Sequence, residues 1–127
     1  VAEDSAPNRT ILVHLLKKLG YAVVEAADGA IAWQLYEKHK AQMNFVCVLS
    51  DIMMPNMDGI GLLKSFRCNE ATKNIPFVLI TAVSDKEFII QAKALNVNGY
   101  ILKPVTFQRV LGKLQELFPT KVFPKVA

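Results

Sequence analysis

The stretch that decides the fold covers Val46–Gly59 and has the sequence VCVLSDIMMPNMDG. It opens with a run of apolar residues, the pattern of a strand that is buried on both faces of a parallel sheet. The run ends at Asp51 and passes into a loop that contains Pro55, Asn56 and Asp58. In open α/β sheets, binding and chemistry take place at the carboxyl ends of the strands. Asp51 is therefore either a functional carboxylate or only a turn residue, and the rest of the chain decides between the two.

Strand and helix patterns alternate along the whole chain. After a stub of a first strand at Val1-Ala2, strands are predicted at Tyr21–Ala27, Val46–Ser50, Pro76–Ile80 and Tyr100–Leu102. Helices are predicted at Pro7–Leu19, at Ala30–Lys40, at Ile60–Cys68, from Ser84 or Asp85 to Leu95, and at Thr106–Phe118. This alternation predicts a parallel sheet with helices on both faces, joined by right-handed crossovers.

Local signals set the ends and the inner faces of the helices. Ser5 or Asp4 is predicted to cap the first helix, and Asp58 is predicted to cap the third. Apolar residues recur at helical spacing, which predicts that Ile11 and Ile31 face the core from the first and second helices.

Composition and charge narrow the class of protein. The 127 residues suffice for one domain, and 52% hydrophobic and 20% charged residues are ordinary globular proportions. The net charge of +4 comes from scattered lysines without an arginine-rich stripe, so we predict no direct nucleic-acid binding by this domain. No apolar run approaches the roughly 20 residues that cross a bilayer, and we expect neither a membrane-spanning segment nor a signal peptide. Cys47 and Cys68 lack metal-ligand spacing and predict free thiols, hence a cytoplasmic location.

Polar residues stand where the successive strands end: Glu3 and Asp4, then Asp51, Thr81 and Lys103. In a parallel sheet these ends meet at one edge. Carboxylates that lie so close repel one another unless a cation joins them, and hard oxygen ligands without nearby His or Cys suit Mg²⁺. The Lys103 ammonium and the Thr81 hydroxyl complete a site for a phosphoryl group, whose equatorial oxygens they would neutralise during in-line transfer.

This set of residues, in this order, resembles the receiver domain of the CheY-like response regulators of two-component signal transduction. The resemblance covers nearly the whole chain and rests on Val1–Asp4, Asp51–Gly59, Leu79–Ala82 and Gly99–Pro104. It implies a flavodoxin-like α/β fold, a single doubly wound five-stranded parallel sheet in the order 2-1-3-4-5 with helices on both faces. Residues 1–119 would form the receiver domain, and residues 120–127 a C-terminal tail or the start of a linker.

The resemblance implies a phosphoacceptor and a metal site. Asp51 would be the phosphoacceptor. Mg²⁺ (or Mn²⁺) would be held by Asp4, by Glu3 directly or through water, by Asp51 itself and by the backbone carbonyl of Met53.

The resemblance also implies a phosphoryl-binding set and a switch. Thr81, the backbone of Ala82 and Lys103 would bind the phosphoryl group. Tyr100 matches the aromatic residue that moves inward together with Thr81, although an aromatic on a short strand is often only part of the core. The Lys103–Pro104 bond would be cis.

The implied function is a phosphorylation switch. A sensor histidine kinase or phosphotransfer protein would donate a phosphoryl group to Asp51, and the conformational change would signal to a downstream effector protein or domain. The contact face would be the fourth helix and fifth strand, about Lys86–Leu102, together with the fifth helix. The chain would not be an enzyme: it would show only slow self-dephosphorylation, because Met53 and Val83, two residues after Asp51 and Thr81, cannot orient water.

Three alternatives remain at this stage. A phosphatase with an aspartyl nucleophile, similar to the haloacid dehalogenase family, needs a second acid two residues after Asp51, where this chain has Met53. A degenerate receiver would act only as a docking module, but the set of acids is complete. A flavin-binding domain of the same topology would meet an acidic edge that repels its phosphate. The sequence identifies neither the kinase nor the output.

The first strand is nearly absent from this sequence. In the order 2-1-3-4-5 that strand is interior, so its neighbours would expose backbone groups along a gap. We expect that residues upstream of Val1 normally fill the gap. The alternative is that Lys121–Val126 of another copy fills it, although Pro124 argues against a central strand there.

Overall fold

The alternation of strands and helices predicted from the sequence is present in the computed structural model, which describes residues 1–82 and 86–119. Along the chain the elements are α1 (Ala6–Lys18), α2 (Gly29–His39), β1 (Val48–Asp51), α3 (Gly59–Arg67), β2 (Phe77–Thr81), α4 (Lys86–Ala94), β3 (Gly99–Leu102) and α5 (Phe107–Leu117). The strands form a parallel sheet in the order β1-β2-β3. None of the helices in the described part of the chain has the length and apolar character that a membrane crossing requires.

The first two predicted strands form isolated bridges. Ala2 pairs in parallel with Ala26 on one side and with Ser50 on the other. The five segments therefore lie in the predicted order 2-1-3-4-5, with β1, β2 and β3 as its last three members. Tyr21–Ala27 was expected to be a full strand, and this is wrong: in the described residues its bridge to the first strand is the single pair Ala26–Ala2, because the first strand is only a short stub around Ala2.

A hollow of about 450 Å³ lies beside the first-strand position. Residues 20–24 and 43–49 line it together with Val1 and Ala2, so the gap expected next to the first strand is present. The amino group of Val1 donates a hydrogen bond of 2.9 Å to the Val24 carbonyl at this site. Cys47 also lines the hollow, and burial raises the pKa of its thiol to about 12. Cys47 and Cys68 are both free thiols.

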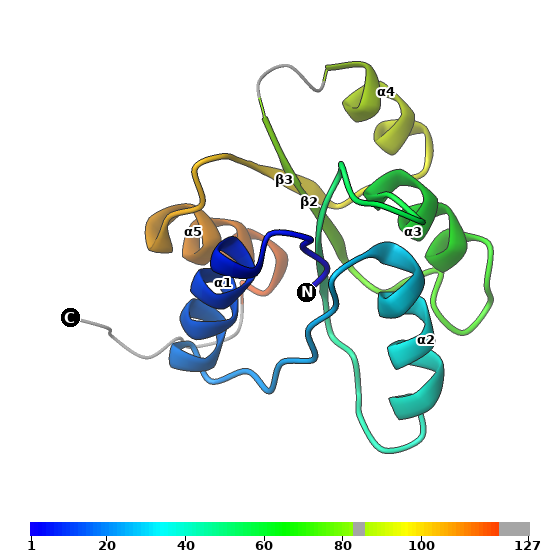
Figure 1. The fold of residues 1–127 in the computed structure, drawn as a ribbon, viewed down its shortest axis with the longest axis horizontal. Helices are drawn as coiled ribbons and strands as arrows, with labels where there is room; N and C mark the ends of the chain where they lie inside the picture. The colour runs from blue at the N-terminus through cyan, green and yellow to red at the C-terminus, as the bar shows by residue number, and fades with distance from the viewer. Residues whose placement is uncertain (83–85, 120–127) are drawn as a thin grey trace.

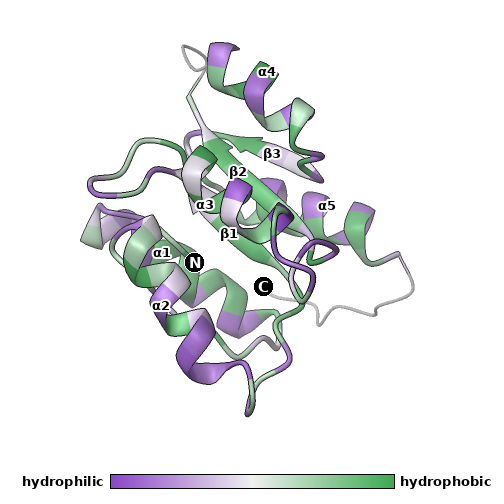
Figure 2. Ribbon diagram, turned by 90° about the vertical axis from the view of Figure 1, so that its right-hand side faces the viewer, coloured by the Kyte–Doolittle hydropathy of each residue, from purple (hydrophilic) through white to green (hydrophobic). Residues whose placement is uncertain are grey.

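Helices cover both faces of the sheet (Figure 1), and each face has its own apolar core. The α1 and α5 face is built on Leu12, Leu16, Val110, Leu114 and the strand residues Leu49, Val78, Ile80 and Ile101. The opposite face joins residues of α2, α3 and α4 to the sheet, namely Tyr36, Leu62, Leu63, Phe66, Ala92, Phe77 and Leu79. Figure 2 shows the apolar colouring of the strands between these layers.

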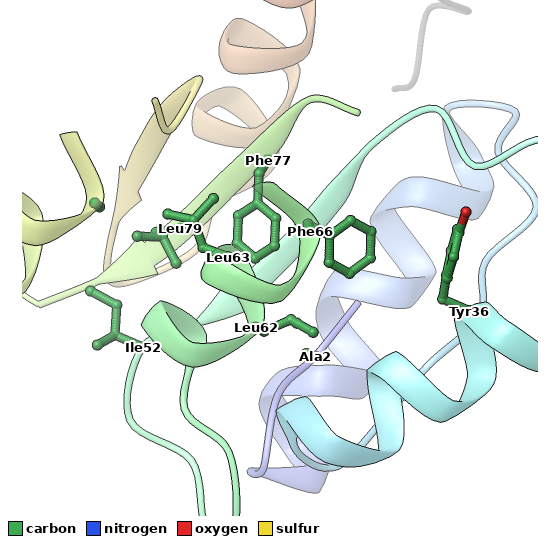
Figure 3. Close-up of a cluster of buried hydrophobic side chains, with 9 residues drawn as sticks. Ala2, Tyr36, Ile52, Leu62, Leu63, Phe66, Phe77 and Leu79 are labelled. Atoms are coloured by element: carbon green, nitrogen blue, oxygen red, sulfur yellow. The ribbon is translucent and has the colours of Figure 1, made fainter. Parts of the chain in front are cut away.

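Aromatic rings connect α2 and α3 to the sheet. Figure 3 shows Phe66 between Phe77 and Tyr36, and the ring centroids are 5.8 Å and 5.4 Å apart. Trp33 stacks on Tyr36 at 5.5 Å and meets Phe66 edge-on at 5.2 Å. Edge-to-face pairs of this kind add to the stabilisation from apolar burial, so α2 and α3 are held firmly against each other.

The helix signals were right for the cap at Asp58, right only about the N-cap position for Ser5, and wrong for two inner faces. The Asp58 side chain caps α3 by accepting a hydrogen bond from Gly61 N, whereas Ser5 stands at the N-cap of α1 without a side-chain bond. Ile11 is 52% exposed and Ile31 is 39% exposed, so neither lies in the core. Ile11 precedes the buried Leu12, and one residue turns the helix by about 100° away from the sheet.

Three of the sequence predictions concern parts of the chain outside the described residues. They are the start of the fourth helix at Ser84 or Asp85, the role of Val83, and the tail at residues 120–127, which includes Lys121–Val126.

Candidate metal and phosphoryl site

Three carboxylates meet at the carboxyl edge of the sheet. Glu3, Asp4 and Asp51 each place one oxygen so that these atoms lie within 4.8 Å of one another. Asp51 is the last residue of β1, and Glu3 follows the bridge residue Ala2. Glu3 is 2% exposed and Asp51 is 4% exposed, whereas Asp4 is open to solvent. The edge position that the sequence predicted therefore brings the acids together.

The acid cluster carries more negative charge than its surroundings favour. Burial is the main factor that raises the pKa of Glu3 to about 7; the neighbouring Asp51 adds to this, and a hydrogen bond from Ser5 N of 3.0 Å opposes it. A positive partner beside Glu3 and Asp51 would therefore favour the ionised form of Glu3. A donor set of hard oxygens, without histidine or cysteine ligands in the cluster, fits Mg²⁺.

Lys103 supplies a positive charge to the cluster. Its Nζ lies 2.9 Å from Asp51 Oδ2, while Asp51 Oδ1 accepts a hydrogen bond of 2.9 Å from Ile52 N. Partial burial alone would lower the pKa of Lys103, but the hydrogen bond and charge of Asp51, with Glu3 and Asp4, raise it. Lys103 therefore stays an ammonium at neutral pH. The Lys103–Pro104 peptide bond is cis.

Thr81 closes the neighbouring strand at the same edge. It is the last residue of β2, it is 1% exposed, and its hydroxyl donates to the Ala82 carbonyl at 3.0 Å. The sheet register pairs Asp51 with Ile80 and Thr81 with Leu102. The hydroxyl-bearing residue thus ends its strand one position beyond the level of Asp51.

Tyr100 lies at the surface. It is 42% exposed and borders a hollow of about 380 Å³, which Thr81 and Ala82 also line. The alternative that Tyr100 is only a core residue therefore does not fit. Met53, two residues after Asp51, has a side chain that is 58% exposed.

Two polar residues that the sequence analysis did not assign to the site, Asp28 and Asn56, contact each other next to the loop that follows Asp51. Asp28 Oδ1 caps α2 by accepting from Ile31 N at 2.8 Å, and its Oδ2 accepts from Asn56 Nδ2 at 2.8 Å. Asn56 belongs to the loop after Asp51, and its φ of 65° is a left-handed conformation. The sequence signals were an Asp-Gly pair before a helix and an asparagine after proline, which indicate a cap and a turn but not their contact.

Gly59 closes the same loop close to Asp51. Gly59 N donates to the Ile52 carbonyl at 2.8 Å, and a Cβ at this position would lie 2.2 Å from the Asp51 carbonyl oxygen. Only glycine permits this approach, so Gly59 is part of what sets the position of the Asp51 backbone.

Fold and site together define a flavodoxin-like α/β domain with an acidic site and a lysine at the carboxyl edge of its sheet. The sequence model of the response regulator receiver domain family matches residues 1–115 of this chain. The chain therefore belongs to the response regulator receiver domain family.

Curated relatives and solved structures agree with this assignment. Chemotaxis protein CheY-3 of Vibrio cholerae is 39% identical over 119 residues, which cover 93% of this chain and 88% of the relative. The structure of chemotaxis protein CheY4 of Vibrio cholerae has a TM-score of 0.81 at 30% identity and covers 91% of this chain and 92% of that one. These matches do not favour the phosphatase, flavin-binding or docking-module alternatives.

A third similar protein bears on the metal. The receiver domain of a sensor histidine kinase from Pseudomonas aeruginosa PAO1 has a TM-score of 0.80 at 25% identity, with 94% of each chain covered. That structure contains a magnesium ion coordinated in the active site cleft.

Proposed function

We propose that this chain is a phosphoacceptor domain in which Asp51 takes a phosphoryl group from a sensor histidine kinase or a phosphotransfer protein. The observation that carries the proposal is the cluster of Glu3, Asp4 and Asp51 with Lys103 Nζ 2.9 Å from Asp51 Oδ2. Asp51 is a buried carboxylate that lies beside the Lys103 ammonium and beside two further carboxylates that could hold a cation. This arrangement suits the binding of an anionic group better than the stabilisation of the fold.

The donor set supports Mg²⁺ (or Mn²⁺) as the cofactor. Glu3, Asp4, Asp51 and the Met53 carbonyl would hold it, and the magnesium ion in the similar Pseudomonas aeruginosa receiver domain supports this choice. When bound, the cation offsets the negative charge shared by the carboxylates and the phosphoryl oxygens.

In the transfer, a carboxylate oxygen of Asp51 forms a bond to phosphorus while the bond from phosphorus to the donor's histidine nitrogen breaks. That nitrogen keeps the electron pair, and the donor leaves as neutral imidazole because its other ring nitrogen carries a proton when the transfer begins. Lys103 pairs with one phosphoryl oxygen, and the Thr81 hydroxyl and the Ala82 backbone N–H donate to others. These groups stand at the strand ends before the reaction, which lowers the cost of arranging them.

The signal leaves through the face next to Thr81. Engagement of the Thr81 hydroxyl by the phosphoryl group shifts a two-state equilibrium in which Tyr100 moves inward. The face of α4, β3 and α5 presents Ile90, Tyr100 and Leu102 with 70%, 42% and 40% exposure, which suits a downstream effector protein or domain. The chain acts as a signalling protein of the cytoplasm rather than as an enzyme, with residues 1–119 as the acting domain.

Mass spectrometry after incubation with Mg²⁺ and acetyl phosphate tests the proposal. We expect a gain of one phosphoryl group, lost in Asp51→Asn and on removal of Mg²⁺ with a chelator. Asp58→Asn is the matched control, because asparagine also caps helices well and the gain should persist. Turnover of a phosphate ester would favour the phosphatase instead, and no gain at all would favour a docking module.

A further inference from the structure

The loop after Asp51 is attached to α2 by side chains 28 residues apart in sequence. Asn56 Nδ2 donates to Asp28 Oδ2 at 2.8 Å, while Asp28 Oδ1 accepts from Ile31 N at 2.8 Å. Asp28 is 4% exposed. One oxygen of its carboxylate thus binds the helix and the other binds the loop. We call the Asp28–Asn56 pair the latch.

Backbone contacts reinforce the latch. Gly29 N donates to the Met57 carbonyl at 2.9 Å, and a Cβ on Gly29 would lie 2.5 Å from that oxygen. Asn56 has a φ of 65°, a conformation that asparagine, aspartate and glycine tolerate best. Three features therefore hold the tip of the loop against the start of α2: the close approach at Gly29, the left-handed conformation of Asn56 and the buried carboxylate of Asp28.

The other end of the loop is fixed at the acid cluster. Gly59 N bonds to the Ile52 carbonyl at 2.8 Å, directly after Asp51. The loop from Ile52 to Asp58 is thus held at its base beside Asp51 and at its tip on α2, and Met53 lies between these two anchors.

We propose that Asp28 and Asn56 are a positioning pair for the metal site: they fix the loop that carries Met53, and through it they set the affinity for Mg²⁺ and the rate of phosphoryl uptake by Asp51. The inference rests on the proposed function. Neither residue belongs to the cluster of Glu3, Asp4 and Asp51 that would bind the metal. We therefore infer that both act through the position of the loop. A loop that must be ordered on binding lowers affinity by the entropy of ordering.

A polarity swap tests the latch. Asn56→Asp places two carboxylates against each other at about pH 8, where both are ionised. Combining it with Asp28→Asn restores one donor and one acceptor, with the direction of the hydrogen bond reversed. Asparagine at position 28 is still a good helix cap, and aspartate at position 56 still tolerates a positive φ. The double variant also has the net charge of the wild type. Titration calorimetry with Mg²⁺ alone measures the dissociation constant of each variant.

We expect Asn56→Asp to weaken Mg²⁺ binding by about tenfold, the size typical of groups that orient metal ligands, and the swap to return to within about threefold of the wild type. The weakening would occur although the variant adds a negative charge near the cation. Asn56→Gly, which keeps the backbone conformation but removes the amide, should also weaken binding. Asn74→Asp, the same change at an exposed loop residue, should not.

The outcomes separate the latch from simple stability and from the proposed function. If Asn56→Asp lowers only the thermal midpoint and binds Mg²⁺ like the wild type, or if the swap fails to recover binding, the latch has no positioning role. If the wild type binds Mg²⁺ and the swap recovers it, but acetyl phosphate adds nothing to Asp51, the latch holds for the metal and the proposed function fails. A wild type that binds no Mg²⁺ overturns both.

Discussion

Lys103 Nζ and Asp51 Oδ2 lie 2.9 Å apart although the two residues are separated by 52 positions in sequence. Asp51 ends β1, Lys103 follows β3, and β2 lies between these strands. The lysine therefore reaches across the end of β2, where Thr81 is buried. This ion pair places the ammonium on the same carboxylate that a divalent cation would share.

Lys103→Met should separate the two uses of this carboxylate. Removal of the ammonium relieves like-charge repulsion, so we expect Mg²⁺ to bind several-fold tighter. Phosphoryl uptake from acetyl phosphate should slow by about tenfold or more, because one compensating charge on the phosphoryl oxygens is lost. Calorimetry and timed mass spectrometry measure the two effects. Unchanged uptake would show that Lys103 does not act on the phosphoryl group.

Met53 should control the lifetime of the phosphorylated state. Its side chain is 58% exposed beside the site and offers no hydrogen bond to orient an attacking water. We expect slow decay of the phosphorylated wild type and faster decay in Met53→Asn, with little change in stability because the residue is at the surface. Phosphorylation followed by removal of the donor and timed mass measurement checks this. Decay within seconds that Met53→Asn leaves unchanged would contradict it.

Two glycines should respond to alanine in opposite directions. A Cβ on Gly59 would lie 2.2 Å from the Asp51 carbonyl oxygen, so Gly59→Ala should lower the free energy of unfolding by about 1–3 kcal/mol. Gly112 lies within α5 and a Cβ there meets nothing within 4 Å. Gly112→Ala should therefore raise the free energy of unfolding by about 0.5–1 kcal/mol.

Urea denaturation measures both glycine variants. Gly59→Ala should also reduce Mg²⁺ affinity, because the backbone of Asp51 has to shift, while Gly112→Ala should leave it unchanged. Equal stability of the two variants would show that the loop beside Asp51 adapts without cost.

The strand-end residues were predictable because strand direction alone places them. Once a chain alternates strand and helix, the carboxyl ends of parallel strands share an edge, and Glu3, Asp51, Thr81 and Lys103 follow from their positions. The cap at Asp58 was equally local, since an N-cap bond joins residues only a few positions apart.

Features that depend on packing between distant segments were not predictable in the same way. The contact of Asp28 with Asn56 requires the position of α2 against the loop, which no local pattern specifies. Apolar spacing placed Ile31 in the core, yet it lies at the surface, about 140° around α2 from the buried Tyr36. Tyr21–Ala27 has strand propensity, but a strand needs a partner of matching length, and the stub around Ala2 is too short to be one.

Asp28 should make the stability of the fold depend on pH in the acid range. The hydrogen bond from Ile31 N, followed by that from Asn56, lowers the pKa of Asp28. A depressed pKa means that the ionised form stabilises the fold above the ordinary aspartate pKa of about 4, and that this contribution is lost as pH falls through the lowered value. In Asp28→Asn the contribution is absent at every pH. The difference in free energy of unfolding between wild type and Asp28→Asn, measured with urea at about pH 6 and again near pH 3, should therefore shrink as the solution is acidified. A difference that stays constant over this range would mean that Asp28 is not held in its ionised form by α2 and the loop.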